Sequence, residues 1–253
     1  MRFLAVALVL AVTPACAADN FYPLYAAGHY DDAIRAGTQA GSAEGFAIAA
    51  RAALAEAGLR PEPCLSCLKR AEDFARKSVA ADADLSDGHV WLAAALGLEG
   101  RIVGMVRARL ANSPAEAKTQ LDVALKDDPG NPYALAALGG WHIEIVRAGG
   151  AYLARNLYDA REVDGLALFD RAVKAAPGNV AVRYQIALSL AGYQPEKFRN
   201  RIAQDLEAAI RSAPQTEYEK FIQARAAELL ALLNRSDAAA LAAKVHQFQG
   251  YPS

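Results

Sequence analysis

The chain has 253 residues, a formal net charge of −1 and 54% apolar residues, with alanine prominent among them. Such a near-neutral balance excludes binding of nucleic acid by bulk electrostatic attraction. Aromatic residues make up only 8%, and the alternating β-branched pattern of strands is nearly absent, so the composition favours closely packed helices throughout.

The first seventeen residues are typical of a secretory signal. Arg2 precedes an apolar run over 3–12, and residues 13–17 end in the small-residue pattern of a cleavage site. We expect cleavage after Ala17 and a periplasmic or secreted protein. The alternative of a membrane anchor needs about 20 apolar residues, twice the run present. Acylation of Cys16 as a lipoprotein is disfavoured because a threonine and a proline stand where a lipobox has an aliphatic and a small residue.

Removal of residues 1–17 takes one arginine and no acid, which brings the net charge to −2. Residues 18–253 contain no second long apolar run, no linker and no low-complexity block, so we expect one domain without a stable membrane span. Within it, helical periodicity predicts helices that pair in order. The expected pairs are 20–27 with 30–40, 43–57 with 64–81, 87–110 with 114–127, 132–158 with 162–175 and 179–191 with 196–212, followed by capping helices over 217–233 and 236–249.

A pattern of small, aliphatic or aromatic, and small residues followed by proline marks the second helix of three pairs. Residues three and four apart share a helix face, so each copy predicts a narrow stripe that lets a neighbouring helix approach closely. Proline then ends the helix. The copies are Ala117-x3-Leu121-x2-Ala124-x4-Pro129, Gly165-x3-Phe169-x2-Ala172-x4-Pro177 and Ile202-x3-Leu206-x2-Ala209-x4-Pro214.

The first helices carry a leucine or isoleucine followed by a small residue, as in tetratricopeptide (TPR) repeats. The pairs are Leu54-Ala55, Leu92-Ala93, Leu138-Gly139 and Ile186-Ala187, with a weaker Gln223-Ala224. The chain therefore resembles the TPR superfamily, which implies an all-α fold: an α–α superhelix, or TPR-like solenoid, of about five helix pairs plus C-terminal capping helices. A concave surface along the first helices is where such arrays present their binding groove.

Two units are lengthened, through Gly100–Ser113 and Ala148–Arg161, because successive pairs lie 46 and 48 residues apart where a standard repeat has about 34. The segments Gly140-Trp141-His142-Ile143-Glu144-Ile145-Val146, 151–158 and 167–172 resemble the lengthened unit of the regulator-of-microtubule-dynamics family, over about residues 70–212. That resemblance implies a helical adaptor or scaffold. Microtubule binding is not carried over to a chain that begins with an export signal.

These two extensions repeat an arginine-glycine-arginine spacing, Arg101-x2-Gly104-x4-Arg109 and Arg147-x2-Gly150-x4-Arg155, at an offset of 46 residues. No acid falls within 100–115 or 145–158. We expect stacking to bring these arginines together with Arg107 into a rim that accepts acidic groups, and the glycines to permit close approach of a helix or ligand. The alternative is that the arginines are solvated or pair with Glu116, Asp122, Glu162 and Asp164.

Trp141 and His142 are further candidates for the binding surface. The competing interpretation is that His142 occupies the aromatic position of the repeat motif and that the aromatic residues pack between helices. Cys64 and Cys67 are most simply a disulfide in an oxidising compartment. A redox site or an idle reduced pair remain alternatives, whereas haem attachment would need histidine where Leu68 stands.

Motifs of catalysis and of metal or nucleotide binding are missing from the sequence, and the four histidines lack ligand spacing. We therefore expect no enzyme, no metal and no cofactor. The favoured function is an exported scaffold that binds a protein or peptide of the cell envelope in its concave groove. The alternative is a periplasmic carrier of a small anionic solute that works with a transporter.

Overall fold

The computed structural model describes residues 21–252, and within them it contains thirteen helices and no strand. The predicted signal peptide, 1–17, lies outside the described residues. The helices are α1 Phe21–Ala26, α2 Tyr30–Ala40, α3 Ala43–Leu59, α4 Leu65–Ala81, α5 Ser86–Val103, α6 Met105–Leu110, α7 Ser113–Asp127, α8 Pro132–Tyr158, α9 Glu162–Ala175, α10 Val180–Tyr193, α11 Arg199–Arg211, α12 Glu217–Asn234 and α13 Ala238–Phe248.

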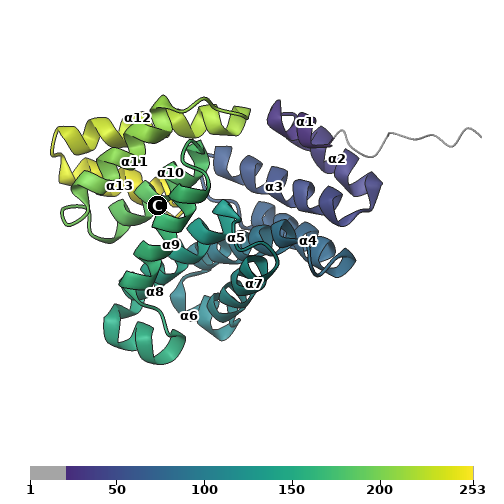
Figure 1. Ribbon diagram of the computed structural model, residues 1–253, viewed down its shortest axis with the longest axis horizontal. Coiled ribbons are helices and arrows are strands. Elements are labelled where there is room, and N and C mark those ends of the chain that lie inside the picture. Colours follow the sequence, from purple (N-terminus) through teal and green to yellow (C-terminus); the bar gives the residue numbers. More distant parts are fainter. Residues whose placement is uncertain (1–20, 253) are drawn as a thin grey trace, which may run out of the picture.

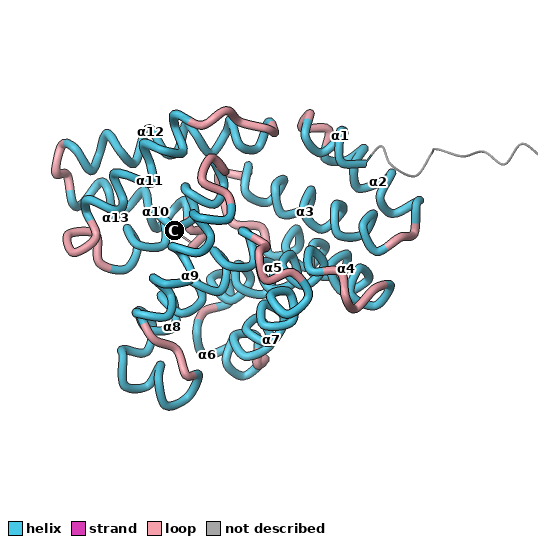
Figure 2. The backbone as a smooth tube through the Cα atoms, in the orientation of Figure 1, coloured by secondary structure: helices cyan, strands magenta, loops and turns pink. Residues whose placement is uncertain are grey.

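Successive helices pack against one another from α1 to α13, joined by short turns (Figures 1 and 2). The first helices of the units, α3, α5, α8, α10 and α12, also contact each other in that order, and we call them the inner row. This arrangement confirms the predicted all-α superhelix of helix pairs. In the described part of the chain, no helix combines the length and the apolar character needed to cross a membrane.

The predicted stripes of small and aliphatic residues are confirmed as buried seams. Ala117, Leu121 and Ala124 of α7 are buried, as are the equivalent residues of α9 and α11. At Gly139 on α8 a Cβ atom would lie 2.9 Å from the carbonyl oxygen of Gly165 on α9, closer than real Cβ contacts allow. The small residues of the repeat therefore let the two helices of a unit touch backbone to backbone.

The expected single helix over 87–110 is wrong, because the chain breaks at Gly104 into α5 and α6. Gly104 has φ 84° and ψ 157°, and Gly150 inside α8 has the closely similar φ 71° and ψ 161°. Only glycine adopts this conformation readily. The expectation that these glycines permit close approach is also wrong, since no atom lies within 4 Å of a Cβ built at either residue. They bend the chain, and a short helical segment follows each bend.

The last units curl back onto the first. Arg225 of α12 donates a 3.1 Å hydrogen bond to the carbonyl oxygen of Gly58 at the end of α3, across 167 residues of sequence. Tyr218 lies against the same glycine, and Glu217 against Gly28. Figure 1 shows the beginning of α12 next to α1 and α3. The concave side of the superhelix is therefore narrowed by its own C-terminal unit.

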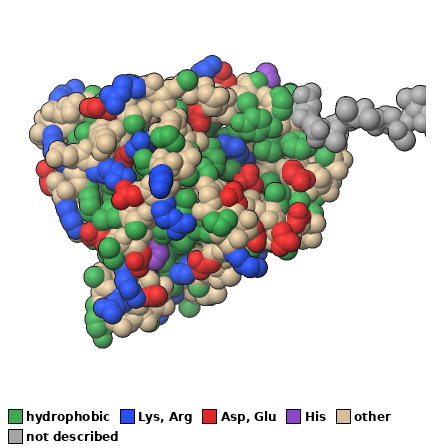
Figure 3. Space-filling model, viewed as in Figure 1, with side chains coloured by type: hydrophobic (Ala, Val, Ile, Leu, Met, Phe, Trp, Pro, Cys, Tyr) green, Lys and Arg blue, Asp and Glu red, His purple; other side chains and the backbone are tan. Residues whose placement is uncertain are grey.

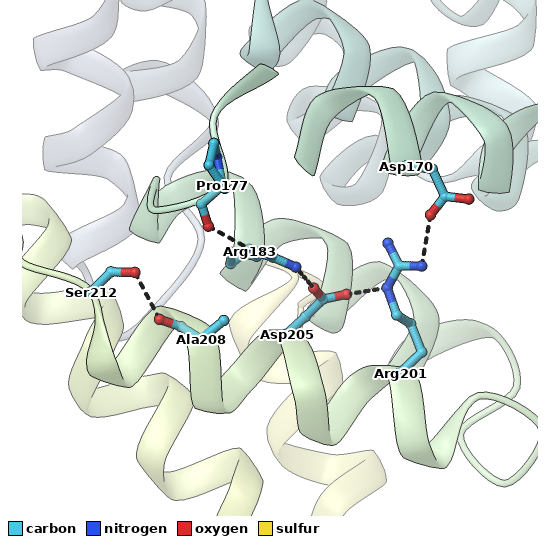
Figure 4. A network of polar contacts seen from close by, with 7 residues as sticks. All are labelled: Asp170, Pro177, Arg183, Arg201, Asp205, Ala208 and Ser212. Carbon is cyan, nitrogen blue, oxygen red and sulfur yellow. Dashed lines mark hydrogen bonds and ion pairs between the residues drawn. The ribbon is translucent and has the colours of Figure 1, made fainter. Parts of the chain in front are cut away.

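An ion network holds the fifth helix pair, α10 and α11, to α9 of the fourth (Figure 4). Asp205 of α11 accepts hydrogen bonds from Arg183 of α10 at 2.6 Å and from Arg201 at 2.7 Å. Arg201 also donates at 2.7 Å to Asp170 of α9. Since Asp205 has no exposed surface, both of its oxygens are satisfied by guanidinium groups from two helices.

Candidate functional site

An arginine surrounded by aromatic rings lies on the inner row. The guanidinium carbon of Arg51 on α3 is 4.6 Å from the ring centre of Tyr25 and 5.0 Å from those of Trp91 and Tyr133. Distances below 6 Å give favourable cation–π contacts. Burial raises the pKa of the Tyr25 phenol, and the charge of Arg51 opposes that rise. The cluster thus keeps a permanent positive charge inside the array.

Hydrogen-bond donors in this region have few acceptors. Arg51 donates once, from Nη2 to the hydroxyl of Tyr133 at 3.1 Å, although a guanidinium has five N–H groups. Asn179 at the start of α10 donates to the same hydroxyl at 3.0 Å. The indole nitrogen of Trp91 on α5 is buried without any partner in the described residues, as is the hydroxyl of Tyr184 further along α10, on the side of Arg225. Unpaired buried donors cost free energy, so they mark a place where a ligand acceptor would be stabilising.

An opening of about 200 Å³ lies one helical turn from this cluster. Ile48 and Leu85 contribute apolar walls, and Tyr22, 44% exposed, stands at its edge. Two carboxylates, Glu44 and Asp87, complete the lining together with Phe21 and Ala47. Asp87 and Trp91 are four residues apart on α5, as are Ala47 and Arg51 on α3, so the opening and the cluster share helix faces. We call the cluster and the opening together the inner site.

Sequence reasoning missed Arg51, although a signal was present. It is the sole charged residue of an otherwise apolar and alanine-rich stretch, 45–55, where a charged side chain has to find a special environment. Trp91, Tyr133 and Tyr184 were visible as aromatic residues at helical spacing. The convergence of Trp91 and Tyr133 on one arginine depends on the packing of several units and is not readable from spacing.

Of the predicted arginines, Arg101 and Arg147 are brought together, around the C-terminal segment. Their guanidinium carbons lie 5.7 Å and 5.4 Å from the ring centre of Tyr251. Arg101 donates at 2.8 Å to the carbonyl oxygen of Gln249, and Arg147 donates at 2.6 Å to Glu144. Charge-assisted bonds to Arg147 hold the pKa of the Glu144 carboxyl below its usual value, although burial opposes this. Both arginines therefore hold the segment around Gln249 and Tyr251 in place.

Arg107, Arg109 and Arg155 have a different environment. All three are exposed on the short segments that follow Gly104 and Gly150, and none of their side chains forms a hydrogen bond or ion pair with another described residue. Their exposure matches the alternative that these arginines are solvated, and none of them pairs with the four acids considered as partners. Those acids pair elsewhere: Glu116 with Arg76, Asp122 with Lys118, Glu162 with Lys197 and Asp164 with Arg161.

Trp141 and His142 lie inside the second lengthened unit. The Trp141 indole donates at 2.8 Å to the carbonyl oxygen of Pro114, and its ring packs edge-on against His142 and Tyr158. His142 accepts a 3.2 Å hydrogen bond from the backbone of Arg161, and burial lowers its pKa. Both side chains are over 90% buried and join helices, so they are not part of an open surface.

Cys64 and Cys67 form a disulfide at the start of α4, with their Cα atoms 5.3 Å apart. The bridge closes the first turn of the helix next to the loop between α3 and α4. Among residues 21–252, no group of three or more histidine, cysteine, aspartate or glutamate side chains is placed to hold a metal ion.

No protein-family model matches the chain, and no curated protein matches it at a significant level.

Proposed function

We propose that this protein is a non-catalytic helical-repeat scaffold of the cell envelope, which binds a short peptide segment of a partner protein at the inner site. The observation that carries the proposal is the presence of donors with few acceptors along the inner row: the unpaired Trp91 indole, the Arg51 guanidinium with its single hydrogen bond and, further along on α10, the unpaired Tyr184 hydroxyl. An extended peptide offers a row of carbonyl acceptors, which matches donors spread over several helices.

The opening beside the cluster supports a peptide more than a whole small molecule. Ligand sites for small molecules usually measure about 300–1,000 Å³, and this opening has about 200 Å³, enough for one side chain. Its apolar walls suit an aliphatic or aromatic residue, and the carboxylates of Glu44 and Asp87 suit a basic neighbour. The expected ligand is therefore a peptide with adjacent apolar and basic residues.

A carrier of a small anionic solute is the second candidate, and the buried charge of Arg51 favours it. A carboxylate would accept from the guanidinium and from the Trp91 indole together. Such a ligand would have to fit a smaller space than is usual and pass two acidic side chains at the opening. A competition experiment distinguishes the two candidates, because an anionic solute that occupies the inner site displaces a bound peptide from it.

The test uses peptides selected from a random display library on the purified protein, with affinity measured by calorimetry. Tyr184→Phe removes one unpaired hydroxyl and keeps the ring, so we expect about 5- to 10-fold weaker binding, the value of one hydrogen bond. Arg51→Gln should weaken binding more. Tyr193→Phe, on the same helix but bonded to Glu162, is the matched control and should bind normally. Selected peptides that bind all three variants like the original protein would refute the inner site.

Export is tested separately by the intact mass of the protein from an envelope fraction. We expect a loss of residues 1–17, and a protein that retains Met1 would contradict the proposed signal peptide.

A further inference from the structure

The two short segments that follow the glycine bends carry a concentration of exposed apolar side chains. We call α6, residues 105–110, and the end of α8, residues 151–158, the tip surface. Its apolar side chains are between 48% and 82% exposed: Met105, Val106, Leu110, Tyr152, Leu153 and Leu157. Figure 1 shows α6 and the end of α8 at the lower end of the molecule, and Figure 3 shows hydrophobic and basic side chains at that end, with an acidic one beside them.

Each segment is amphipathic in the same way. Ala108 is the buried residue of α6, and successive helical residues are rotated by about 100°. Val106 and Leu110 therefore point most directly away from the protein, and Arg107 and Arg109 lie on either side of them. In the second segment Ala154 is buried, Tyr152 points outward with 79% exposure, and Arg155 takes the place of Arg109.

The helices that lead into the two segments meet at one ring. Arg101 and Arg147, each three residues before its glycine, have guanidinium groups within 5.7 Å of the centre of the same ring, that of Tyr251. The bends at Gly104 and Gly150 are alike, so both segments leave their helices in the same manner. The duplicated sequence thus gives two neighbouring units the same exposed segment.

The charge of the tip surface is positive only. Arg107, Arg109 and Arg155 have no acidic partner in the described chain, and residues 100–115 and 145–158 contain no acid. The carboxylate that follows the second segment, Asp159, accepts a hydrogen bond from Arg161 at 2.8 Å. Three guanidinium groups without an acidic partner thus lie next to outward-pointing apolar side chains. This combination is complementary to a surface that is negatively charged outside and apolar beneath.

We propose that the tip surface docks the protein peripherally on an anionic lipid bilayer, with the apolar side chains in the headgroup region and the three arginines on lipid phosphates. Short amphipathic segments of this composition bind membrane interfaces, and arginine stems can lie along apolar surface with the charge at the headgroups. The opening of the inner site lies between α1, α3 and α5, away from the tip surface. The tip surface instead presents protruding side chains, which can enter a fluid lipid interface. A second copy of the protein fits the tip surface less well, because two tip surfaces in contact would bring six arginines of like charge together.

The test is co-sedimentation with vesicles of phosphatidylcholine, with and without phosphatidylglycerol, at low and high salt. Every protein is purified with the same N terminus, so any contribution of residues 1–17 cancels. One variant replaces Arg107, Arg109 and Arg155 with Gln, and another replaces Val106, Leu110 and Tyr152 with Ser. The controls replace Arg35, Arg60 and Arg211 with Gln, and Leu59 and Ile210 with Ser, all exposed residues outside the tip. Circular dichroism and the unfolding midpoint establish that each variant is folded.

We expect binding to anionic vesicles that weakens at high salt and is lost with phosphatidylcholine alone. Each arginine near an anionic surface contributes roughly fivefold, so the arginine variant should partition on the order of 100-fold more weakly. The serine variant should also fail to bind, whereas both controls should bind like the original protein.

Absence of binding to anionic vesicles, or equal binding by the tip variants and the original protein, overturns the proposal. A dimer in sedimentation velocity that the tip variants abolish, without vesicle binding, would assign the surface to a second copy. Peptide affinity at the inner site is unaffected by these outcomes.

Discussion

The guanidinium of Arg183 donates a 2.6 Å hydrogen bond from α10 to Asp205 of α11, a side chain without exposed surface (Figure 4). Removing a partner from a buried pair leaves an uncompensated charge, so Asp205→Ala should lower the free energy of unfolding by about 3–5 kcal/mol. Urea denaturation measures this. Glu207→Ala on the same helix, whose partner Arg211 is exposed, should change it by less than about 1 kcal/mol. Equal effects would contradict the structural importance of the network.

Tyr184→Phe should leave the protein as stable as before, or more stable by up to about 1 kcal/mol, because it removes a buried hydroxyl that has no partner. The control Tyr193→Phe removes a 2.8 Å hydrogen bond to Glu162 and should cost about 0.5–1.5 kcal/mol. Thermal unfolding of both variants checks the prediction. A destabilised Tyr184→Phe would mean that the hydroxyl is satisfied in the free protein.

The need for glycine at the bend in α8 can be tested by substituting two adjacent glycines, one at a time. Gly150→Ala places a Cβ on a residue with φ 71° and should cost about 1–3 kcal/mol. Gly149→Ala, where the added Cβ meets the Cβ of Leu153 at an ordinary 3.6 Å, should be neutral or stabilising by about 0.5–1 kcal/mol. Urea denaturation, with hydrogen exchange over residues 145–158, distinguishes them. Equal costs would mean that the bend is not required.

Stability should depend on pH through Glu99. Burial raises the pKa of this carboxyl to about 7, and the neighbouring charge of Glu72 adds to the rise. Because the folded pKa exceeds that of the unfolded chain, the protonated form stabilises the fold, fully below about pH 4.5 and progressively less as pH rises to 7. After screening by solvent we expect a loss of roughly 1 kcal/mol. Glu99→Gln should remove this loss, and a variant that retains the full pH dependence would assign it to another group.

The disulfide should contribute modestly to stability. A loop of four residues, Cys64 to Cys67, gives about 2 kcal/mol in the chain-entropy account. The double variant Cys64→Ser with Cys67→Ser should lose about that much in urea denaturation and should keep its peptide affinity if the bridge is a structural staple. Thiol titration of the unreduced, unfolded protein should find no free thiol. A readily reduced bridge would favour the redox alternative.

The arginines of the extensions show where prediction from sequence reaches its limit. Duplication at an offset of 46 residues predicted that they act together, and Arg101 and Arg147 do lie around one ring. That ring belongs to Tyr251, over a hundred residues away, so fastening of the chain end could not be read from local spacing. Gly104 and Gly150 were recognised as special positions, but their backbone conformation, and so the direction of the short segments, was not.

By itself the sequence determined the helical class, the order of the helix pairs and the buried seams, because these follow from periodicity of 3.6 residues, from small side chains on one face and from proline stops. Only the tertiary structure decided that α12 closes onto α3 and that Arg51 meets three aromatic rings. These contacts depend on the angle between successive units, a small rotation that accumulates over the whole array. No local sequence pattern determines this accumulated rotation, so the inner site exists only once the superhelix has formed.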